Sequence, residues 1–202
     1  MKLYYAPGAC SFAPHAALVA LGLPAEVIKV DLRTHKLADG TDYYAINPKG
    51  YVPLLELDDG TRLTEVAVLL QHIADRKPGT LAPAFGTAER YKLMEWLNFI
   101  ATEIHKGYGP LWYPDTPAAT RETTLAKLAK RYEHIDAHLA KQPFLTGESL
   151  SIADIYLHTV TNWSKFLKVD LSAYPNVVAF QERMAANPAV AETKRRESGG
   201  KG

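Results

Sequence analysis

The sequence predicts a small α/β domain followed by an all-helical domain. In the first third of the chain, short apolar segments typical of strands alternate with segments of helical spacing. Beyond a stretch that contains several prolines and glycines, apolar residues recur every three or four positions, as in helices that pack through one face. The predicted boundaries are 1–77 for the α/β domain, 78–86 for the linker and 87–202 for the helical domain.

A βαβ unit is predicted at the start of the chain. Lys2–Tyr5 is short and β-prone, Phe12–Leu21 has helical spacing, and Gly22 supplies a helix-stop signal. Ala25–Leu32 alternates apolar and polar residues, as expected of a second strand. Connections of this type are almost always right-handed. The polar, turn-rich residues 33–50 are expected to form a loop or a short helix.

A hairpin and a helix complete the predicted first domain. Val52–Leu57 and Thr61–Leu63 flank Asp58-Asp59-Gly60, and Asp-Gly between apolar runs strongly favours a hairpin. Pro53 cannot donate to a strand ladder, so we expect it at an edge or in a special turn. Thr64–Asp75 has helical spacing. One side of that helix is expected to carry Val68, Leu69, His72 and Ile73.

Two long helices are predicted on either side of Pro110–Pro117. Ser151–Asp154 has the sequence of a capping box and marks the start of a further helix, whose apolar positions are Tyr156, Leu157, Val160 and Trp163. Pro175–Ala186 is expected to form another helix. The tail Ser198–Gly202 has the composition of a disordered end. The periodic positions of the two long helices are Leu93, Trp96, Leu97, Ile100 and Ile104, then Leu125, Leu128, Tyr132, Ile135 and Leu139.

Composition excludes several classes of protein. The 202 residues include 23 basic and 22 acidic side chains, a net charge of +1, which gives no general attraction to nucleic acid or to an anionic membrane. No apolar run approaches the roughly 18 residues needed to span a bilayer, and no secretory signal pattern is present. The single cysteine excludes an internal disulfide and an all-thiolate metal site. We expect a cytoplasmic globular protein.

Cys10 is the strongest candidate for chemistry. It lies between the first strand and the first helix, where backbone N–H groups and the helix dipole stabilise a thiolate and lower its pKa. A single cysteine is more often a small buried hydrophobe. The strand–turn–helix context favours the chemical role, because open α/β sheets bind ligands at such turns. Ala13 stands where a Cys-x-x-Cys motif would place a second cysteine.

Histidines supply the next candidates. His105, on the polar side of the first long helix, could donate to a sulfur or act as a general base, although most histidines in such a position are only solvated. His134 and His138 lie one helical turn apart, as metal ligands can, but no third ligand is evident. We therefore interpret them as a surface pair, and no metal site is predicted.

Glu65 and Val66 begin the helix that follows the hairpin. Free N–H groups at a helix start can hold a carboxylate, and Glu65 could bind an ammonium group. An acidic first turn favoured by the helix dipole explains Glu65 at least as well. His35 and Lys36, in the long loop, could contact a second carboxylate or be merely solvated.

Taken together, these motifs resemble those of the cytosolic glutathione transferases, most closely the bacterial beta class. The matching segments are Lys2–Tyr5, Pro7–Ser11, Ala45–Gly50 with Val52-Pro53, Leu63–Glu65, Glu95–Ala101, His105–Gly107 and the capping box Ser151–Asp154. Each segment alone is weak evidence, but their order and spacing over nearly the whole chain are specific to this family. The resemblance implies a thioredoxin-like N-terminal domain, an all-α C-terminal domain and a homodimer.

The resemblance also implies a site. Cys10 and His105 would be the catalytic residues beside the glutathione sulfur, and a cis Val52-Pro53 bond would let the Val52 backbone pair with the cysteinyl part of glutathione. Glu65 and the N–H of Val66 would hold the γ-glutamyl end. The implied glutathione-binding residues, some contributed across the dimer, are Cys10, His35, Lys36, Val52, Pro53, Glu65, Val66, Asn98, Thr102, Glu103 and His105.

Two departures from the class pattern predict weaker glutathione binding. His35 stands where the class usually has lysine, so its charge depends on pH. Val66 stands where serine or glycine is usual, which removes a hydroxyl contact and crowds the position with a branched side chain. A lost hydrogen bond to a charged group costs roughly 1.5–3 kcal/mol. Candidates for an apolar substrate pocket, which core packing explains equally well, are Phe12, Tyr108, Trp112 and Tyr113.

The implied activity is conjugation of glutathione, as co-substrate, to small hydrophobic electrophiles, as in detoxification. Cys10 suggests a second activity, thiol–disulfide or peroxide chemistry. One alternative is a reductive dehalogenase or an isomerase that uses glutathione. Another is a non-catalytic interaction protein on the same scaffold, against which the presence of Cys10, Glu65 and His105 argues.

Overall fold

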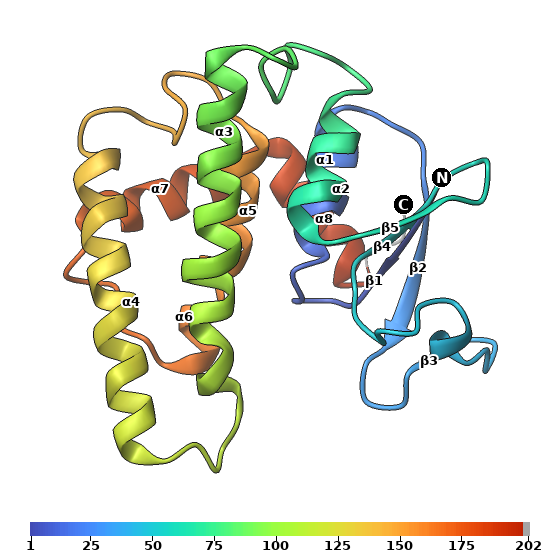
Figure 1. Ribbon diagram of the computed structural model, residues 1–202, viewed down its shortest axis with the longest axis horizontal. Coiled ribbons are helices and arrows are strands. Elements are labelled where there is room, and N and C mark those ends of the chain that lie inside the picture. The colour runs from blue at the N-terminus through green and yellow to red at the C-terminus, as the bar shows by residue number, and fades with distance from the viewer. Residues whose placement is uncertain (200–202) are drawn as a thin grey trace.

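The computed structural model describes residues 1–199. Two regions lie side by side: a sheet with helices against it, formed by residues up to 74, and a group of helices that begins at residue 88 (Figure 1). α3 (Ala88–Phe99) and α4 (Ala118–Leu139) are the long helices of the second region. The predicted fold class, an α/β region followed by an all-helical one, is confirmed.

The N-terminal sheet has five strands in the order β3-β2-β1-β4-β5. β1 (Lys2–Tyr5) pairs in parallel with β2 (Glu26–Asp31) and antiparallel with β4 (Leu54–Glu56), which pairs with β5 (Arg62–Thr64). The predicted βαβ unit and hairpin are therefore confirmed. β3 (Lys36–Leu37), an antiparallel partner of β2, is not among the predicted elements, because two residues are too few to show an alternating pattern.

The Val52-Pro53 peptide bond is cis and directly precedes β4. Pro53 thus lies in a turn just outside the ladder of a central strand, where its missing N–H is not needed. The structure therefore selects the turn over the sheet edge, and it confirms the cis bond that the resemblance implies.

α1 (Phe12–Ala20) and α2 (Val66–Ala74) lie on the side of the sheet that faces the helical region (Figure 1). The buried residues of α2 are Val66, Leu69, Leu70, Ile73 and Ala74. The expected apolar side is therefore only partly right. Val68 is 45% exposed, because the buried stripe of α2 runs through residues 66, 69, 70 and 73 and leaves position 68 outside it.

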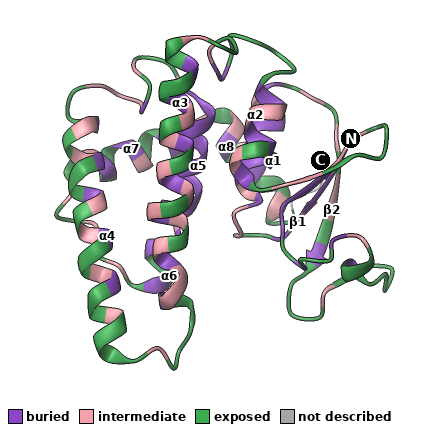
Figure 2. Ribbon diagram, in the orientation of Figure 1, coloured by how far each residue is buried: buried purple, intermediate pink, exposed green. Residues whose placement is uncertain are grey.

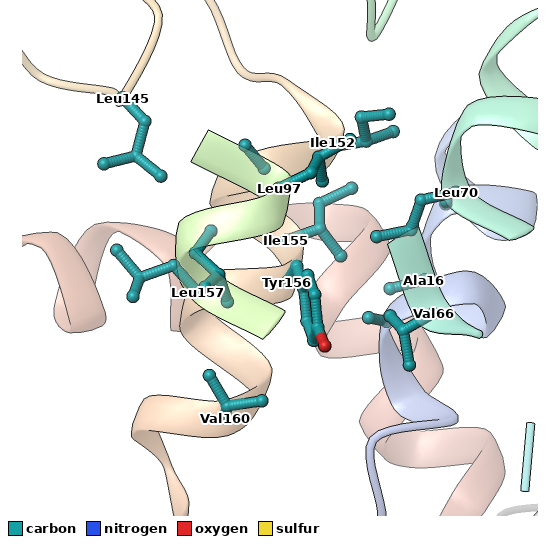
Figure 3. Packing of buried hydrophobic residues seen from close by; sticks show 14 of the residues in the cluster. Ala16, Val66, Leu70, Leu97, Leu145, Ile152, Ile155, Tyr156, Leu157 and Val160 are labelled. Carbon is teal, nitrogen blue, oxygen red and sulfur yellow. The ribbon is translucent and has the colours of Figure 1, made fainter. Parts of the chain in front are cut away.

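α5 (Ile152–Thr161) is the central helix, and every one of its residues is buried (Figure 2). The predicted capping box begins it: the Asp154 carboxylate accepts hydrogen bonds from the N–H of Ser151 at 2.8 Å and from its hydroxyl at 2.6 Å. Figure 3 shows Tyr156 of α5 near Ala16 of α1. The two regions share one apolar core.

The first long helical segment changes its winding before it ends. α3 is followed by a π-helical segment, η2 (Ile100–His105), and then by a 3-10 segment, η3 (Lys106–Trp112). The sequence pattern predicts a regular helix through Ile104, and local propensity carries no signal for the change. π-helical turns are rare and frequently lie at functional sites. His105 is the last residue of this one.

α6 (Trp163–Leu167), α7 (Pro175–Ala185) and α8 (Pro188–Glu197) complete the chain. α7 agrees with the prediction. α8 is not predicted, although its start has a recognisable signal: the Asn187 side chain caps it, and proline occupies the first turn.

α8 returns to the N-terminal region and packs against α1. Its Glu197 Oε1 lies 2.9 Å from His15 Nδ1, and both side chains are almost fully buried. The N–H of Ser198 still bonds to the carbonyl oxygen of Lys194 at 3.0 Å, so the expected disorder does not begin at residue 198. The rest of the predicted disordered tail, 200–202, lies outside the described residues.

Candidate functional site

Cys10 lies in the turn between β1 and α1, directly before the N-cap residue Ser11. The hydroxyl of Ser11 holds this turn through hydrogen bonds with the N–H and the carbonyl oxygen of Ala6, each 3.1 Å long. The partly buried thiol of Cys10 donates to the carbonyl oxygen of Val52 across 3.4 Å. The cysteine is thus held against the cis-proline turn before β4.

Burial raises the pKa of the Cys10 thiol to about 12, and the nearby Glu65 carboxylate adds to the rise. The backbone N–H groups of Cys10 and Ser11 favour the thiolate but are outweighed. The expectation of a lowered pKa is therefore wrong for the protein without ligand. One reason is that the first helical amide, that of Phe12, already bonds to the carbonyl oxygen of Ala9 at 3.1 Å.

The segment that leads into Val52 is anchored by two buried side chains. The Tyr43 hydroxyl and the Asn47 side-chain amide both donate to the carbonyl oxygen of Tyr51, at 2.8 and 2.7 Å. Within residues 1–199, the N–H of Val52 forms no hydrogen bond. The backbone of Val52 therefore has a fixed position opposite Cys10 and a donor available to a ligand.

Glu65 caps the start of α2 with a left-handed backbone, φ 71° and ψ 119°. Residues other than glycine rarely adopt this conformation, and such strain concentrates at ligand sites. The N–H of Val66, the first of α2, forms no hydrogen bond within the described part of the chain. The Glu65 carboxylate is 70% exposed and lies 3.4 Å from the Lys49 ammonium group. This helix start therefore offers a free donor and a carboxylate side by side.

The side chain of Val66 points into the core. It is 4% exposed, and Figure 3 shows it beside Ala16 and near the ring of Tyr156. The expected crowding of the site by this branched side chain is therefore corrected: the apolar group is accommodated by core packing. The other expected effect of Val66, the loss of a hydroxyl that could bind a ligand, stays a prediction.

His105 approaches the same site from the end of η2. Its Nδ1 lies 2.7 Å from the hydroxyl of Tyr156. Burial lowers the pKa of His105 to about 4, the Lys106 ammonium acts in the same direction, and Glu65 opposes the shift. The imidazole is therefore neutral near pH 7. Because the Glu65 carboxylate raises the pKa of His105, the imidazole lies close enough to the start of α2 for the two groups to interact electrostatically.

Trp163, the first residue of α6, joins the helical region to the Cys10 turn. Its indole N–H donates a 3.0 Å hydrogen bond to the carbonyl oxygen of Gly8, and its ring meets that of His105 edge-on at 4.9 Å between centroids. Sequence reasoning places Trp163 and Tyr156 only among apolar helix positions. The one feature that could have identified them from the sequence is their polar atom, because a buried Trp or Tyr usually has a hydrogen-bond partner for it.

The side chains of His35 and Lys36 form no hydrogen bond or ion pair with the residues described above, although the carbonyl oxygen of His35 accepts a 2.8 Å hydrogen bond from the N–H of Tyr43. The backbone of His35 is left-handed (φ 52°), and its ring packs on Tyr44 at 4.5 Å between centroids. Tyr44 in turn covers Gly50, where a Cβ would lie 2.6 Å from the tyrosine ring. Packing thus connects His35 to the segment before Val52. Its Nδ1 is buried and has no partner within residues 1–199, whereas Lys36 is exposed.

Asn98, Thr102 and Glu103 are not brought to Cys10 within one chain. Asn98 and Thr102 are exposed, and the Thr102 hydroxyl donates to the carbonyl oxygen of Asn98 at 3.0 Å. Glu103 forms a 2.6 Å ion pair with Arg131 of α4. Their part in binding glutathione, which the resemblance implies partly across a dimer, stays a prediction.

The four aromatic pocket candidates have different surroundings. Trp112 and Tyr113 are 46% and 65% exposed, and Phe12 is partly buried. Tyr108 is 0% exposed, and its hydroxyl lies 2.8 Å from that of Tyr132. Tyr108 therefore belongs to the core, the alternative that the sequence also allows, and its side chain offers no surface to a substrate.

Neither a metal cluster nor a membrane-crossing helix is found among residues 1–199. No three His, Cys, Asp or Glu side chains there are grouped as metal ligands would be, and no helix is both long and apolar enough to cross a bilayer. His138 Nε2 lies 2.9 Å from the carbonyl oxygen of Leu145, so it is not part of the surface pair expected with His134. The chemistry available to the site is that of a thiol, a neutral imidazole, a carboxylate and free backbone donors.

Two family models match the chain, one to each region. The model "Glutathione S-transferase, N-terminal domain" matches residues 9–76, and the model "Glutathione S-transferase, C-terminal domain" matches residues 92–188. Each region therefore matches the family that the sequence motifs resemble.

Relatives match over nearly the full length. Glutathione S-transferase GstA of Escherichia coli O157:H7 is 45% identical over 192 residues, 94% of this chain and 95% of that protein. A ternary complex of BphK, a bacterial glutathione S-transferase, superposes with a TM-score of 0.95 at 46% identity, covering 98% of this chain and all of the other. The beta-class enzyme of Sphingomonas chungbukensis has a TM-score of 0.92 at 40% identity, with 98% of each chain covered. The chain belongs to the glutathione S-transferase family and lies close to its bacterial beta class.

Proposed function

We propose that the protein is a glutathione transferase that conjugates the glutathione thiolate to small hydrophobic electrophiles. The observation that carries this proposal is the convergence of Cys10, Val52, Glu65 and His105. The Cys10 sulfur contacts the Val52 carbonyl, and the Glu65 carboxylate shifts the pKa of both Cys10 and His105. Membership of the family supports the same activity.

The open donors and the carboxylate suit the two charged groups on the α-carbon of a γ-glutamyl group. Its α-carboxylate would accept from the N–H of Val66 at the helix start, and its ammonium would meet the Glu65 carboxylate, now beside Lys49. The backbone of Val52 would pair with the cysteinyl part. The glycyl carboxylate would lie toward His35 or Lys36. Without a hydroxyl at position 66, this site binds glutathione more weakly than one with serine there.

The chemical task is to stabilise the glutathione thiolate. An unperturbed thiol titrates near pH 8.5, so most glutathione carries its proton at neutral pH. The neutral imidazole of His105 and the Cys10 thiol can each donate a hydrogen bond to a sulfur anion, and the Lys106 ammonium adds positive charge. In this scheme the glutathione sulfur replaces the Val52 carbonyl as acceptor of the Cys10 S–H.

The proposal also covers the electrophile, the assembly and the location. The exposed rings of Trp112 and Tyr113, together with Phe12, would receive an apolar electrophile. We propose a cytoplasmic homodimer in which Asn98 and Thr102, exposed in one chain, complete the site of the other. Glutathione serves as co-substrate and no metal takes part.

A second candidate activity is thiol–disulfide exchange, supported by the access of Cys10 to the site. The Cys10 thiolate attacks a mixed disulfide of glutathione, releasing the other thiol and leaving Cys10 joined to glutathione. A second glutathione thiolate then regenerates Cys10 and leaves as oxidised glutathione. Cys10→Ala separates the two activities: conjugation survives and disulfide reduction disappears if the cysteine serves only the exchange. If neither activity changes, the assignment of Cys10 is wrong.

The proposal is tested by calorimetric titration with glutathione and by conjugation assays with a panel of electrophiles. We expect binding and turnover in the wild type, both lost in Glu65→Ala, whereas Glu148→Ala, an exposed control far along the chain, retains them. Binding without conjugation of any electrophile favours a dehalogenase or isomerase. Absence of binding favours a non-catalytic interaction protein. Mass spectrometry of the titrated protein detects a Cys10–glutathione adduct.

A further inference from the structure

Tyr156 is the residue that connects the buried core to the catalytic histidine. It lies in α5, is 2% exposed, and its ring packs among side chains of α1, α2 and α5 (Figure 3). Its hydroxyl has one hydrogen-bond partner within residues 1–199, the Nδ1 of His105 at 2.7 Å. Burial raises the pKa of this hydroxyl, and the nearby Cys10 and Glu65 add to the rise, so Tyr156 stays protonated.

The direction of this hydrogen bond follows from the inventory of donors and acceptors. A neutral imidazole has one N–H donor and one bare acceptor nitrogen. If Nδ1 carried the proton, the buried Tyr156 hydroxyl would accept that bond, and its own hydrogen would have no acceptor in the described chain. Leaving a buried donor unpaired is costly. The tyrosine therefore donates to Nδ1, and the imidazole proton is on Nε2.

The remaining ring nitrogen of His105 is open. Nε2 forms no hydrogen bond within residues 1–199, and it is not among the buried nitrogens that lack a partner there. We infer that Tyr156 is a positioning residue, which fixes the tautomer and orientation of His105 so that its Nε2–H points at the glutathione sulfur. This role rests on the proposed function. It makes His105 a hydrogen-bond donor to the thiolate and not the base that removes its proton.

Tyr156→Phe removes the hydroxyl and retains the packed ring. We expect kcat/KM for conjugation to fall roughly three- to tenfold, the loss of one hydrogen bond. The fall should be larger at pH 6.5 than at pH 9, because a weaker donor raises the apparent pKa of bound glutathione. Glu65, Lys106 and Cys10, the other ionisable groups that face His105 and Tyr156, are unchanged in this variant. An unchanged pH profile would overturn the proposal.

Tyr132→Phe is the matched control. Its hydroxyl is also buried and hydrogen-bonded, to Tyr108 and Thr161, but it does not contact His105. Tyr132→Phe should lower stability without moving the pH profile. Equal shifts in the two variants would mean that Tyr156 acts only through general packing.

The tautomer can be observed without activity. Nitrogen-15 NMR of the wild-type protein should show Nε2 protonated and Nδ1 bare in His105, and Tyr156→Phe should populate both tautomers. A protonated Nδ1 in the wild type overturns the inference, whether or not the protein conjugates glutathione. Failure to bind glutathione, with the NMR result as expected, would instead overturn the proposed function.

Two substitutions of His105 provide a further test of the donating atom. The amide of Gln reaches the Nε2 position and that of Asn the Nδ1 position. His105→Gln should therefore retain more conjugating activity than His105→Asn. The reverse order would contradict donation from Nε2.

Discussion

The indole N–H of Trp163 donates a 3.0 Å hydrogen bond to the carbonyl oxygen of Gly8, 155 positions earlier in the chain. Gly8 precedes Cys10 in the turn after β1, and Trp163 begins α6. The bond therefore ties the turn that carries the candidate sulfur to the helical region that carries His105. Because the indole is 5% exposed, water competes little with this contact.

Trp163→Phe should destabilise the protein by about 1–3 kcal/mol, because it leaves the Gly8 carbonyl without its buried donor and reduces packed volume. Urea unfolding monitored by circular dichroism measures the change. Trp112→Phe is the control, since Trp112 is 46% exposed and its indole forms no hydrogen bond within residues 1–199. Similar losses in the two variants would contradict a structural role for the Trp163–Gly8 bond.

Cys10 should react slowly with iodoacetamide at neutral pH. Burial raises the pKa of its thiol to about 12, so the thiolate fraction at pH 7 is far below that of free cysteine, which titrates near pH 8.5. The alkylation rate should rise with pH and show no plateau up to pH 10. Mass spectrometry of timed samples gives the rate. Rapid labelling at pH 7 with a plateau below pH 8 would mean a stabilised thiolate.

The local elements of this fold are predictable because their signals are local. Asp59-Gly60 defines the hairpin between β4 and β5, and Ser151 with Asp154 defines the start of α5. The π-helical segment that ends at His105 carries no such local signal in its sequence.

The candidate site divides in the same way. The position of Cys10 before the first helix is evident from sequence, but its pKa is not, because the Val52 turn and the helical region that bury it are distant in the chain. The sequence does not identify Tyr156 as a site residue for the same reason, because its proposed role depends on a contact with His105, 51 positions away.

Val66→Ser should strengthen glutathione binding and weaken the fold. The added hydroxyl can rotate about the Cα–Cβ bond, away from the core and toward the helix start, and donate to the γ-glutamyl carboxylate. We expect this hydrogen bond to lower Kd by roughly tenfold, the value of one hydrogen bond to a charged group. The lost apolar burial should cost about 1–3 kcal/mol of stability, since Val66 is 4% exposed. Calorimetry gives Kd and urea unfolding gives stability. Val66→Ala, which loses packing without gaining a hydroxyl, is the control. Equal affinities of Val66→Ser and Val66→Ala for glutathione would contradict a role for the hydroxyl.

Acid should destabilise the protein below pH 6.5 through His158. This side chain is 4% exposed, and burial lowers its pKa to about 4 from an ordinary value near 6.5. Its Nε2 lies 3.0 Å from the side-chain nitrogen of Asn162, and its Nδ1 is buried without a hydrogen-bond partner in the described chain. Lys165 and Lys194 also lower its pKa, whereas the Gln181 side chain favours the charged form but does not offset burial.

The sign of the effect follows from proton binding. Between pH 4 and 6.5 the unfolded chain takes up a proton at this position and the folded chain does not, so unfolding becomes easier as the pH falls. The stability that the neutral ring contributes is fully present above pH 6.5 and is lost down to about pH 4, roughly 3 kcal/mol in all. His158→Gln should therefore reduce the difference between urea unfolding free energies measured at pH 7 and pH 4.5. His134→Gln, which removes an exposed imidazole, should leave that difference as in the wild type. Equal acid sensitivity of wild type and His158→Gln would place the titrating group elsewhere, with His105, whose pKa burial lowers in the same way, the next residue to substitute.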